Sequence, residues 1–205
     1  MQYEDEIIGK GAEEKSRKNT PPPNTSIESV GAGRSSLLLL RDIGIAVVII
    51  IVILQFFKPT IVFERSMENT LHPQDYVLLS RQAYTFSDVE HGDIVVFKST
   101  LKDDRGQFKN LIKRVIGLPG DVLEVKDGAV YRNGVRLVEP YTKDGYTSGR
   151  MSPVTVPEGK VFIMGDNREV STDSRSAVIG TVPINELEGK VFFVLLPISR
   201  AGGVR

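Results

Sequence analysis

A long apolar segment near the N-terminus sets the strongest limit on the fold of this chain. From Ile43 to Phe57 every residue is apolar or glycine except Gln55. The leucines before it extend the stretch to residues 37–57, broken only by Arg41 and Asp42. A helix of about 21 residues is about 31 Å long, which matches the hydrocarbon core of a bilayer. The sequence therefore predicts a transmembrane helix over residues 37–57.

Two other structures could account for this segment. A buried core helix would keep a polar stripe, and this run has none. A cleaved signal peptide would be followed by a small-x-small site, and residues 56–60, FFKPT, provide none. An uncleaved signal anchor fits best. Because basic residues occur in the short tail before it, we expect a single-pass plasma-membrane protein with a cytoplasmic N-terminus and an extracytoplasmic C-terminal domain.

The regions on either side of the segment differ in composition. Residues 1–36 mix charges of both signs with proline, glycine and serine and hold few large apolar residues, so we expect a disordered cytoplasmic tail. Residues 58–205 contain short apolar runs bounded by turn residues, at 94–97, 122–125, 160–164 and 191–196. This pattern predicts a mainly β domain.

Two dipeptides predict tight hairpins within that domain. Asp127-Gly128 and Asn133-Gly134 suit type I′ turns, in which both central residues need positive φ. They predict a three-stranded meander over Val122–Leu137. Residues 141–158 are rich in tyrosine, threonine, glycine, serine and proline, and we expect a long mobile loop there.

Composition excludes several kinds of site. Lysine plus arginine equals aspartate plus glutamate at 26 each, so no net field favours nucleic acid. Cysteine is absent, which excludes thiol catalysis, disulfides and thiolate metal sites. The only histidines are His72 and His91, which leave little for a histidine-rich metal site. We therefore expect no metal or cofactor.

Lys113 is a candidate general base. In the run 111–116, LIKRVI, alternation places Leu111, Lys113 and Val115 on one strand face. If that face is inward, burial disfavours the ammonium and lowers the pKa of Lys113. A neutral amine can accept the proton of a serine hydroxyl, whereas the guanidinium of Arg114 cannot. Strand pattern alone also allows Lys113 to extend along the sheet edge to solvent.

Three motifs give this lysine a context. Residues 66–71 read SMENTL, residues 113–121 read KRVIGLPGD, and residues 165–175 read GDNREVSTDSR. In this order after a membrane segment, and with GDIVVF at 92–97, they resemble bacterial type I signal peptidases over about residues 37–197. These are membrane-anchored serine–lysine endopeptidases that remove signal peptides from exported proteins. The resemblance implies an antiparallel, coiled β-sheet catalytic domain.

The resemblance also implies roles for individual residues. Ser66 is the expected nucleophile, Lys113 the general base, and Ser171 the residue that orients the lysine amine. The expected substrates are signal peptides of exported preproteins with small-x-small sites, cleaved through an acyl-enzyme next to the lipid bilayer. A structural polar network is expected from Asp166, Asp173 and Arg175, and pockets for small substrate residues from Met67, Leu71, Leu111 and Ile112.

Two positions depart from the family pattern. Asn69 replaces the family's proline, and asparagine also suits turns. The backbone N–H of Ser66 is one candidate donor to the oxyanion that forms during acyl transfer. Glu64 stands where some members carry a serine whose hydroxyl is the second donor, so this second donor is unassigned. Carboxylates of Glu64 and Glu68, if close, would disfavour a neutral Lys113.

Other functions are weaker candidates. A Ser–His–Asp hydrolase would need His72 or His91, each in a loop-like context that nothing pairs with Ser66. Self-cleaving SOS-type repressors share the dyad but carry a DNA-binding module rather than a membrane anchor. The main alternative is a catalytically weak or silent membrane-anchored β module that binds exported peptides by strand addition.

Overall fold

The structure, a computed structural model, describes residues 30–204, with side chains described from Ser36 onward. The chain divides into two compact units, residues 1–45 and 46–205. Most of the predicted disordered tail falls on residues 1–29, which lie outside the described residues. Residues 30–36 are helical, so the helix begins before the predicted boundary at residue 37.

Helix α1 (Val30–Phe56) contains the apolar segment. Its Ser36–Phe56 part has 21 residues and a mean hydropathy of 2.9, long and apolar enough to cross a membrane. None of this stretch is buried inside the protein. A core helix would be covered by other elements, so the structure argues against that alternative. Phe57 begins strand β1 instead of ending the helix.

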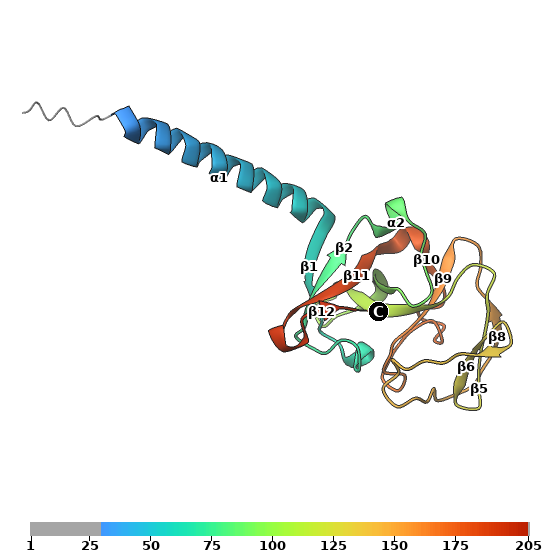
Figure 1. Cartoon of the computed structure of the whole chain (residues 1–205). Coiled ribbons are helices and arrows are strands. Elements are labelled where there is room, and N and C mark those ends of the chain that lie inside the picture. The colour runs from blue at the N-terminus through green and yellow to red at the C-terminus, as the bar shows by residue number, and fades with distance from the viewer. Residues whose placement is uncertain (1–29, 205) are drawn as a thin grey trace, which may run out of the picture. The chain divides into compact units, whose positions relative to one another are not determined.

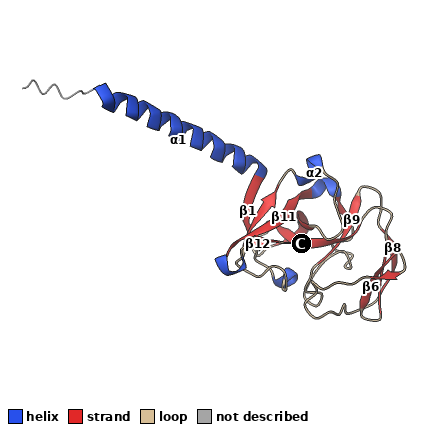
Figure 2. Cartoon of the chain, viewed as in Figure 1, coloured by secondary structure: helices blue, strands red, loops and turns tan. Residues whose placement is uncertain are grey.

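The larger of two sheets carries most of the domain (Figures 1 and 2). All its pairings are antiparallel. Register shifts interrupt several pairings, which bends and coils the sheet. In spatial order its strands are β1 (Phe57–Ile61), β2 (Tyr76–Ser80), β11 (Leu187–Leu196), β3 (Ile94–Lys102), β4 (Phe108–Gly117), β9 (Lys160–Met164) and β10 (Val182–Pro183), and β12 (Gly202–Gly203) pairs with β11.

The smaller sheet contains the predicted meander. Its order is β7 (Val135–Arg136), β6 (Ala129–Arg132), β5 (Val122–Lys126) and β8 (Met151–Thr155). Both predicted turns have positive φ at their two central residues, as type I′ turns require. The meander is therefore confirmed. The prediction of a long loop over 141–158 is wrong in part, because residues 151–155 pair with β5.

The domain core consists of three apolar clusters that lie on both faces of β4. Leu111 and Val115 belong to one cluster, Ile112 packs against a second, and Ile116 belongs to a third. The alternation predicted for residues 111–116 is confirmed, but both faces of the strand are covered. Lys113 and Arg114, on opposite faces, are each only 1% exposed.

Four short helices complete the described part. They are η1 (Arg65–Met67), α2 (Ala83–Phe86), η2 (Ile184–Glu186) and η3 (Ile198–Arg200). The predicted fold class, mainly antiparallel β with one N-terminal apolar helix, is confirmed.

Candidate active site

Ser66 lies in η1, within a loop that closes on itself. The Val62 amide donates to the Asp75 carbonyl at 2.9 Å, and the Gln74 amide donates to the Val62 carbonyl at 2.8 Å. The Leu71 amide donates to the Met67 carbonyl at 2.8 Å, which fixes the turn after the serine. This backbone bonding holds the Ser66 side chain against the sheet, where the residue is 6% exposed.

Lys113 reaches Ser66 from the middle of β4. Its Nζ lies 2.7 Å from Ser66 Oγ and 3.1 Å from the carbonyl oxygen of Ile112. Val95, its partner on β3, is fully buried, as is Val115 on its own strand. The two predicted catalytic side chains, 47 residues apart in sequence, are therefore in direct hydrogen-bond contact.

Burial lowers the pKa of Lys113 from 10.5 to about 8. The nearby carboxylates of Glu64, Asp173 and Asp166 act against this by favouring the charged form. None of them forms an ion pair with Lys113 among the described residues. At pH 7 a group with a pKa near 8 is neutral in about a tenth of the molecules. A usable fraction of free amine therefore exists near neutral pH.

Glu64 and Glu68 have different neighbours. The Glu64 carboxylate pairs with Lys109 at 3.4 Å. Glu68 accepts from Arg65 at 2.7 Å and pairs with Lys143 at 3.3 Å. Of the two, only Glu64 contributes to the pKa of Lys113. The expected opposition to a neutral amine therefore comes from Glu64 and not from Glu68.

Gly165 brings the third motif against Ser66. A Cβ at Gly165 would collide with Ser171 Oγ and with the Ser66 carbonyl oxygen, so the two segments pack here only because glycine lacks one. The Asn167 amide donates to the same carbonyl at 3.0 Å. Ser171 Oγ is buried beside this junction and has no hydrogen-bond partner among the described residues. The hydrogen bond expected between Ser171 and Lys113 is not formed in this structure.

Asp166 and the Asp173–Arg175 pair lie in two groups of polar contacts, which Arg168 connects because its carbonyl accepts from Arg175 at 2.9 Å. In the first, Asp166 forms a bidentate ion pair with Arg114, with contacts of 2.9 and 2.7 Å, and accepts from Thr70 Oγ1 at 2.5 Å. In the second, Asp173 accepts two bonds from the Arg175 guanidinium, at 2.8 and 2.9 Å, one from the Arg175 backbone amide at 3.2 Å, and one from the Gly165 amide. Asp166 therefore supports the strand, and Asp173 supports the turn beside Ser66.

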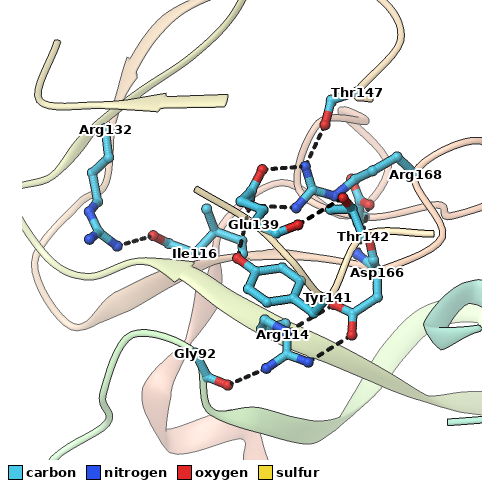
Figure 3. A network of polar contacts seen from close by, with 12 residues as sticks. Gly92, Arg114, Ile116, Arg132, Glu139, Tyr141, Thr142, Thr147, Asp166 and Arg168 are labelled. Atoms are coloured by element: carbon cyan, nitrogen blue, oxygen red, sulfur yellow. Dashed lines mark hydrogen bonds and ion pairs between the residues drawn. The ribbon is translucent and has the colours of Figure 1, made fainter. Parts of the chain in front are cut away.

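The first network extends to residues that sequence reasoning did not assign (Figure 3). Arg168 pairs with Glu139 at 2.6 Å and donates to the Gly165 carbonyl at 3.1 Å. The Tyr141 ring stacks on the Arg114 guanidinium, 4.1 Å from ring centroid to Cζ. Arg168 lies inside the third motif, so the motif itself could have indicated a role for this residue. Glu139 and Tyr141 lie in a segment without a recognised pattern.

Asn69 has a backbone conformation that the family's proline could not adopt. Its φ is +100°, whereas proline is fixed near −65°. Its side-chain amide donates to the Tyr141 carbonyl at 3.0 Å. The substitution thus joins the turn after Ser66 to the segment that covers Arg114.

The predicted substrate-binding side chains lie in two places. Met67 and Leu71 belong to one core cluster, and Ile112 packs against it. Leu111 is only 2% exposed and belongs to a different cluster on the other face of β4. The structure therefore brings Met67, Leu71 and Ile112 together and places Leu111 apart from them. Their contact with substrate stays a prediction.

Neither histidine pairs with Ser66. His91 Nε2 lies 2.7 Å from Asp121, and His72 Nδ1 is buried without a partner among residues 36–204. Across the same residues no group of His, Asp and Glu could hold a metal ion. Of Lys113 and the two histidines, only Lys113 is in hydrogen-bond contact with Ser66 among the described residues.

Comparison with known proteins identifies the family. A family model described as "Signal peptidase, peptidase S26" matches residues 37–196. The chain belongs to this family. A relative named signal peptidase I from Bacillus amyloliquefaciens is 37% identical over 169 residues, 78% of this chain and 87% of the relative. Signal peptidase I S of Bacillus subtilis (strain 168) is 35% identical, over 84% of this chain and 95% of its own length.

A solved structure is also similar to this S26 peptidase. The crystal structure of a signal peptidase I from Enterococcus faecalis V583 shares 32% sequence identity with it, at a TM-score of 0.42. The match covers 51% of this chain and 97% of the crystallised chain.

Proposed function

We propose that this S26 peptidase is a serine endopeptidase that removes N-terminal signal peptides from exported preproteins at small-x-small sites. The observation that carries the proposal is the 2.7 Å contact between Ser66 Oγ and a buried Lys113 amine. Family membership and relatives named signal peptidase I support the substrate class. The Ser36–Phe56 span supports attachment to the membrane, where signal peptides are presented.

In the proposed mechanism Lys113 acts first as base and then as acid. Neutral Nζ takes the proton from Ser66 Oγ while the oxygen attacks the scissile carbonyl. The lysinium returns that proton to the leaving amine, and an acyl-enzyme forms on Ser66. Water then attacks the ester and gives its proton to Nζ, which passes it to the departing Ser66 Oγ. The signal peptide leaves with a new carboxyl group, which ionises in solvent.

The supporting residues keep this geometry. Asp173 and Arg175 fix the turn at Gly165, and Asn167 holds the carbonyl of Ser66. Ser171 is proposed to accept a hydrogen bond from Lys113 when the side chains adjust to substrate, because its hydroxyl is buried beside the site and unpaired. Met67, Leu71, Leu111 and Ile112 are proposed to line the substrate pockets.

We also propose an N-terminus in the cytoplasm and a catalytic domain outside it. The tail before the span carries basic residues, including Lys15, Arg17 and Lys18, which favour the inner side. Ser66 follows the end of the helix by ten residues, so attack would occur close to the membrane surface. A protease-protection assay on sealed vesicles tests this orientation, because the domain should be cleaved from the outer side only.

The test of activity uses the full chain in detergent with a preprotein bearing an Ala-x-Ala site. Wild type should cleave after the second alanine, and Ser66→Ala and Lys113→Ala should lose essentially all cleavage. Lys98→Ala, an exposed lysine on β3, should cleave as wild type does and serves as the matched control. Full activity in Lys113→Ala would refute the dyad. A wild type that binds the preprotein without cutting it would favour the alternative, a silent peptide-binding module.

A further inference from the structure

A cavity away from Ser66 has no role in the proposed reaction. Its volume is about 610 Å³, within the range of roughly 300–1,000 Å³ typical of small-molecule sites. Its lining residues come from the turn after β2, from α2, from the turn before β9, from η2 and from the start of β11. Its walls are formed by Arg81, Tyr84, Thr85, Gly159, Ile184, Asn185 and Leu187.

Three hydrogen-bond donors around this cavity have no side-chain partner among the described residues. They are the Arg81 guanidinium, the Thr85 hydroxyl and the Asn185 amide. No carboxylate lines the cavity within the described part of the chain. The Glu188 carboxylate nearby on β11 is already paired with Lys58 at 3.6 Å. The cavity therefore presents one uncompensated positive charge and two neutral donors, a combination that favours an anion with several oxygens.

Apolar groups share the same cavity. Ile184, Leu187 and the ring of Tyr84 provide its apolar wall. The Tyr84 hydroxyl donates to Asp93 at 3.0 Å, so the phenol is anchored toward the protein and contributes mainly its ring. Phe86, on the same short helix, is 80% exposed. A ligand with an anionic end and an apolar end fits this lining better than a small ion does.

The position of Arg81 along the chain indicates the source of such a ligand. Its backbone amide donates to the carbonyl of Phe56 at 3.0 Å, and Phe56 is the last residue of the apolar span. A span that fills the hydrocarbon core ends near the lipid phosphates. Arg81 therefore lies at the level at which phosphate groups of the bilayer begin.

We propose that this cavity binds the phosphodiester headgroup of an anionic phospholipid, with Arg81 as the main contact and Thr85 and Asn185 as additional donors. The inference rests on the membrane anchoring in the proposed function. Such a site would hold the domain at a fixed height and rotation on the bilayer. It lies apart from Ser66 and Lys113, which do not line it.

The experiment titrates the full chain, in dodecyl maltoside micelles, with dihexanoyl-phosphatidylglycerol and measures the heat of binding. Wild type should bind one lipid saturably, and Arg81→Gln should bind about tenfold more weakly because a charge-assisted contact is lost. Arg136→Gln, an exposed arginine on β7 outside the cavity, should match wild type. Asn185→Ala, a milder change in the same cavity, should weaken binding by a smaller factor and covers the case in which Arg81→Gln misfolds.

Inorganic phosphate is titrated in parallel to separate the two sources of this chemistry. Equal affinity for phosphate, with the same loss in Arg81→Gln, would show a free-phosphate site and overturn the lipid assignment. Undiminished lipid binding in both cavity variants would overturn the site itself. The readout does not involve cleavage. Lipid binding without preprotein cleavage would reject only the proposed function, and cleavage without lipid binding would reject only this site.

Discussion

Two neighbouring basic residues on opposite faces of β4 have different partners. Lys113 and Arg114 are adjacent and equally buried. Arg114 has a bidentate carboxylate partner in Asp166, a stacked ring in Tyr141 and the Gly92 carbonyl at 2.9 Å. Within the described residues, Lys113 has only the Ser66 hydroxyl and the Ile112 carbonyl as hydrogen-bond partners. Equal burial therefore has different consequences on the two faces, because Asp166 compensates the charge of Arg114, whereas Lys113 forms no ion pair among the described residues and burial lowers its pKa.

The largest expected effect comes from removing the partner of Arg114. Asp166→Asn leaves a buried guanidinium without its counter-charge, which costs about 3–5 kcal/mol for comparable buried pairs. The free energy of unfolding of the full chain in detergent should fall by that order. Asp104→Asn, an exposed aspartate in the turn between β3 and β4, should change it little. Replacing both Arg114 and Asp166 by Met and Leu should recover part of the loss, and an equal loss in the double variant would contradict this view.

A smaller effect is expected on the Lys113 face, where close packing at Gly165 helps to position Ser66. Gly165→Ala introduces a Cβ that collides with Ser171 and with the backbone carbonyl of Ser66. The serine should be displaced by a fraction of an ångström or more, and kcat/KM should fall by about 100-fold. Gly202→Ala, where a Cβ would have nothing within 4 Å, is the matched control. Cleavage at the wild-type rate in Gly165→Ala would show that this contact does not position Ser66.

The pH dependence of cleavage tests the state of Lys113. Because burial lowers its pKa to about 8, kcat/KM should rise with pH through about 8 and level off above.

The smallest effect is expected from Glu64→Gln, which removes a carboxylate that raises the pKa of Lys113. The rising limb of the pH profile of kcat/KM should therefore move to lower pH by a fraction of a unit. Glu158→Gln, exposed and not among these carboxylates, should leave the limb in place. A limb near pH 6.5 would instead implicate histidine.

Stability should follow the same group with a defined sign. The unfolded lysine has a pKa near 10.5 and the folded one near 8, so between these values the unfolded chain binds more protons. The free energy of unfolding should therefore rise with pH in that window. Lys113→Met should lack this rise, since methionine carries no titrating group. A rise of the same size in the variant would assign the effect to another residue.

Local signals made part of the fold predictable. The positive φ required at Asp127-Gly128 and Asn133-Gly134 is a property of two residues each, so the meander could be read without its neighbours. Strand β8 could not, because Met151–Thr155 contains Pro153 and lies among turn residues. Its extended form depends on pairing with β5, and that partner lies far away in sequence.

Some residues of the candidate site could be predicted from the sequence and others could not. Motif order led to Ser66 and Lys113, and alternation along 111–116 gave the lysine a route to burial. Nothing local to Asp166 distinguishes a partner of Arg114 from a partner of Lys113, although a direct ion pair with Lys113 would favour its charged form. Glu139, Tyr141 and the role of Gly165 also depend on segments that meet only in the folded chain.

The apolar span and the hairpin turns could be predicted from the sequence because each depends on side chains adjacent along the chain, whereas the serine–lysine hypothesis came from the resemblance of three separate motifs to a family. Three features depend on the folded chain: both faces of β4 are covered, Asp166 compensates the charge of Arg114, and Lys113 contacts Ser66. Desolvation and ion pairing depend on which groups surround a charge in three dimensions, and those groups come from strands and loops distant in sequence.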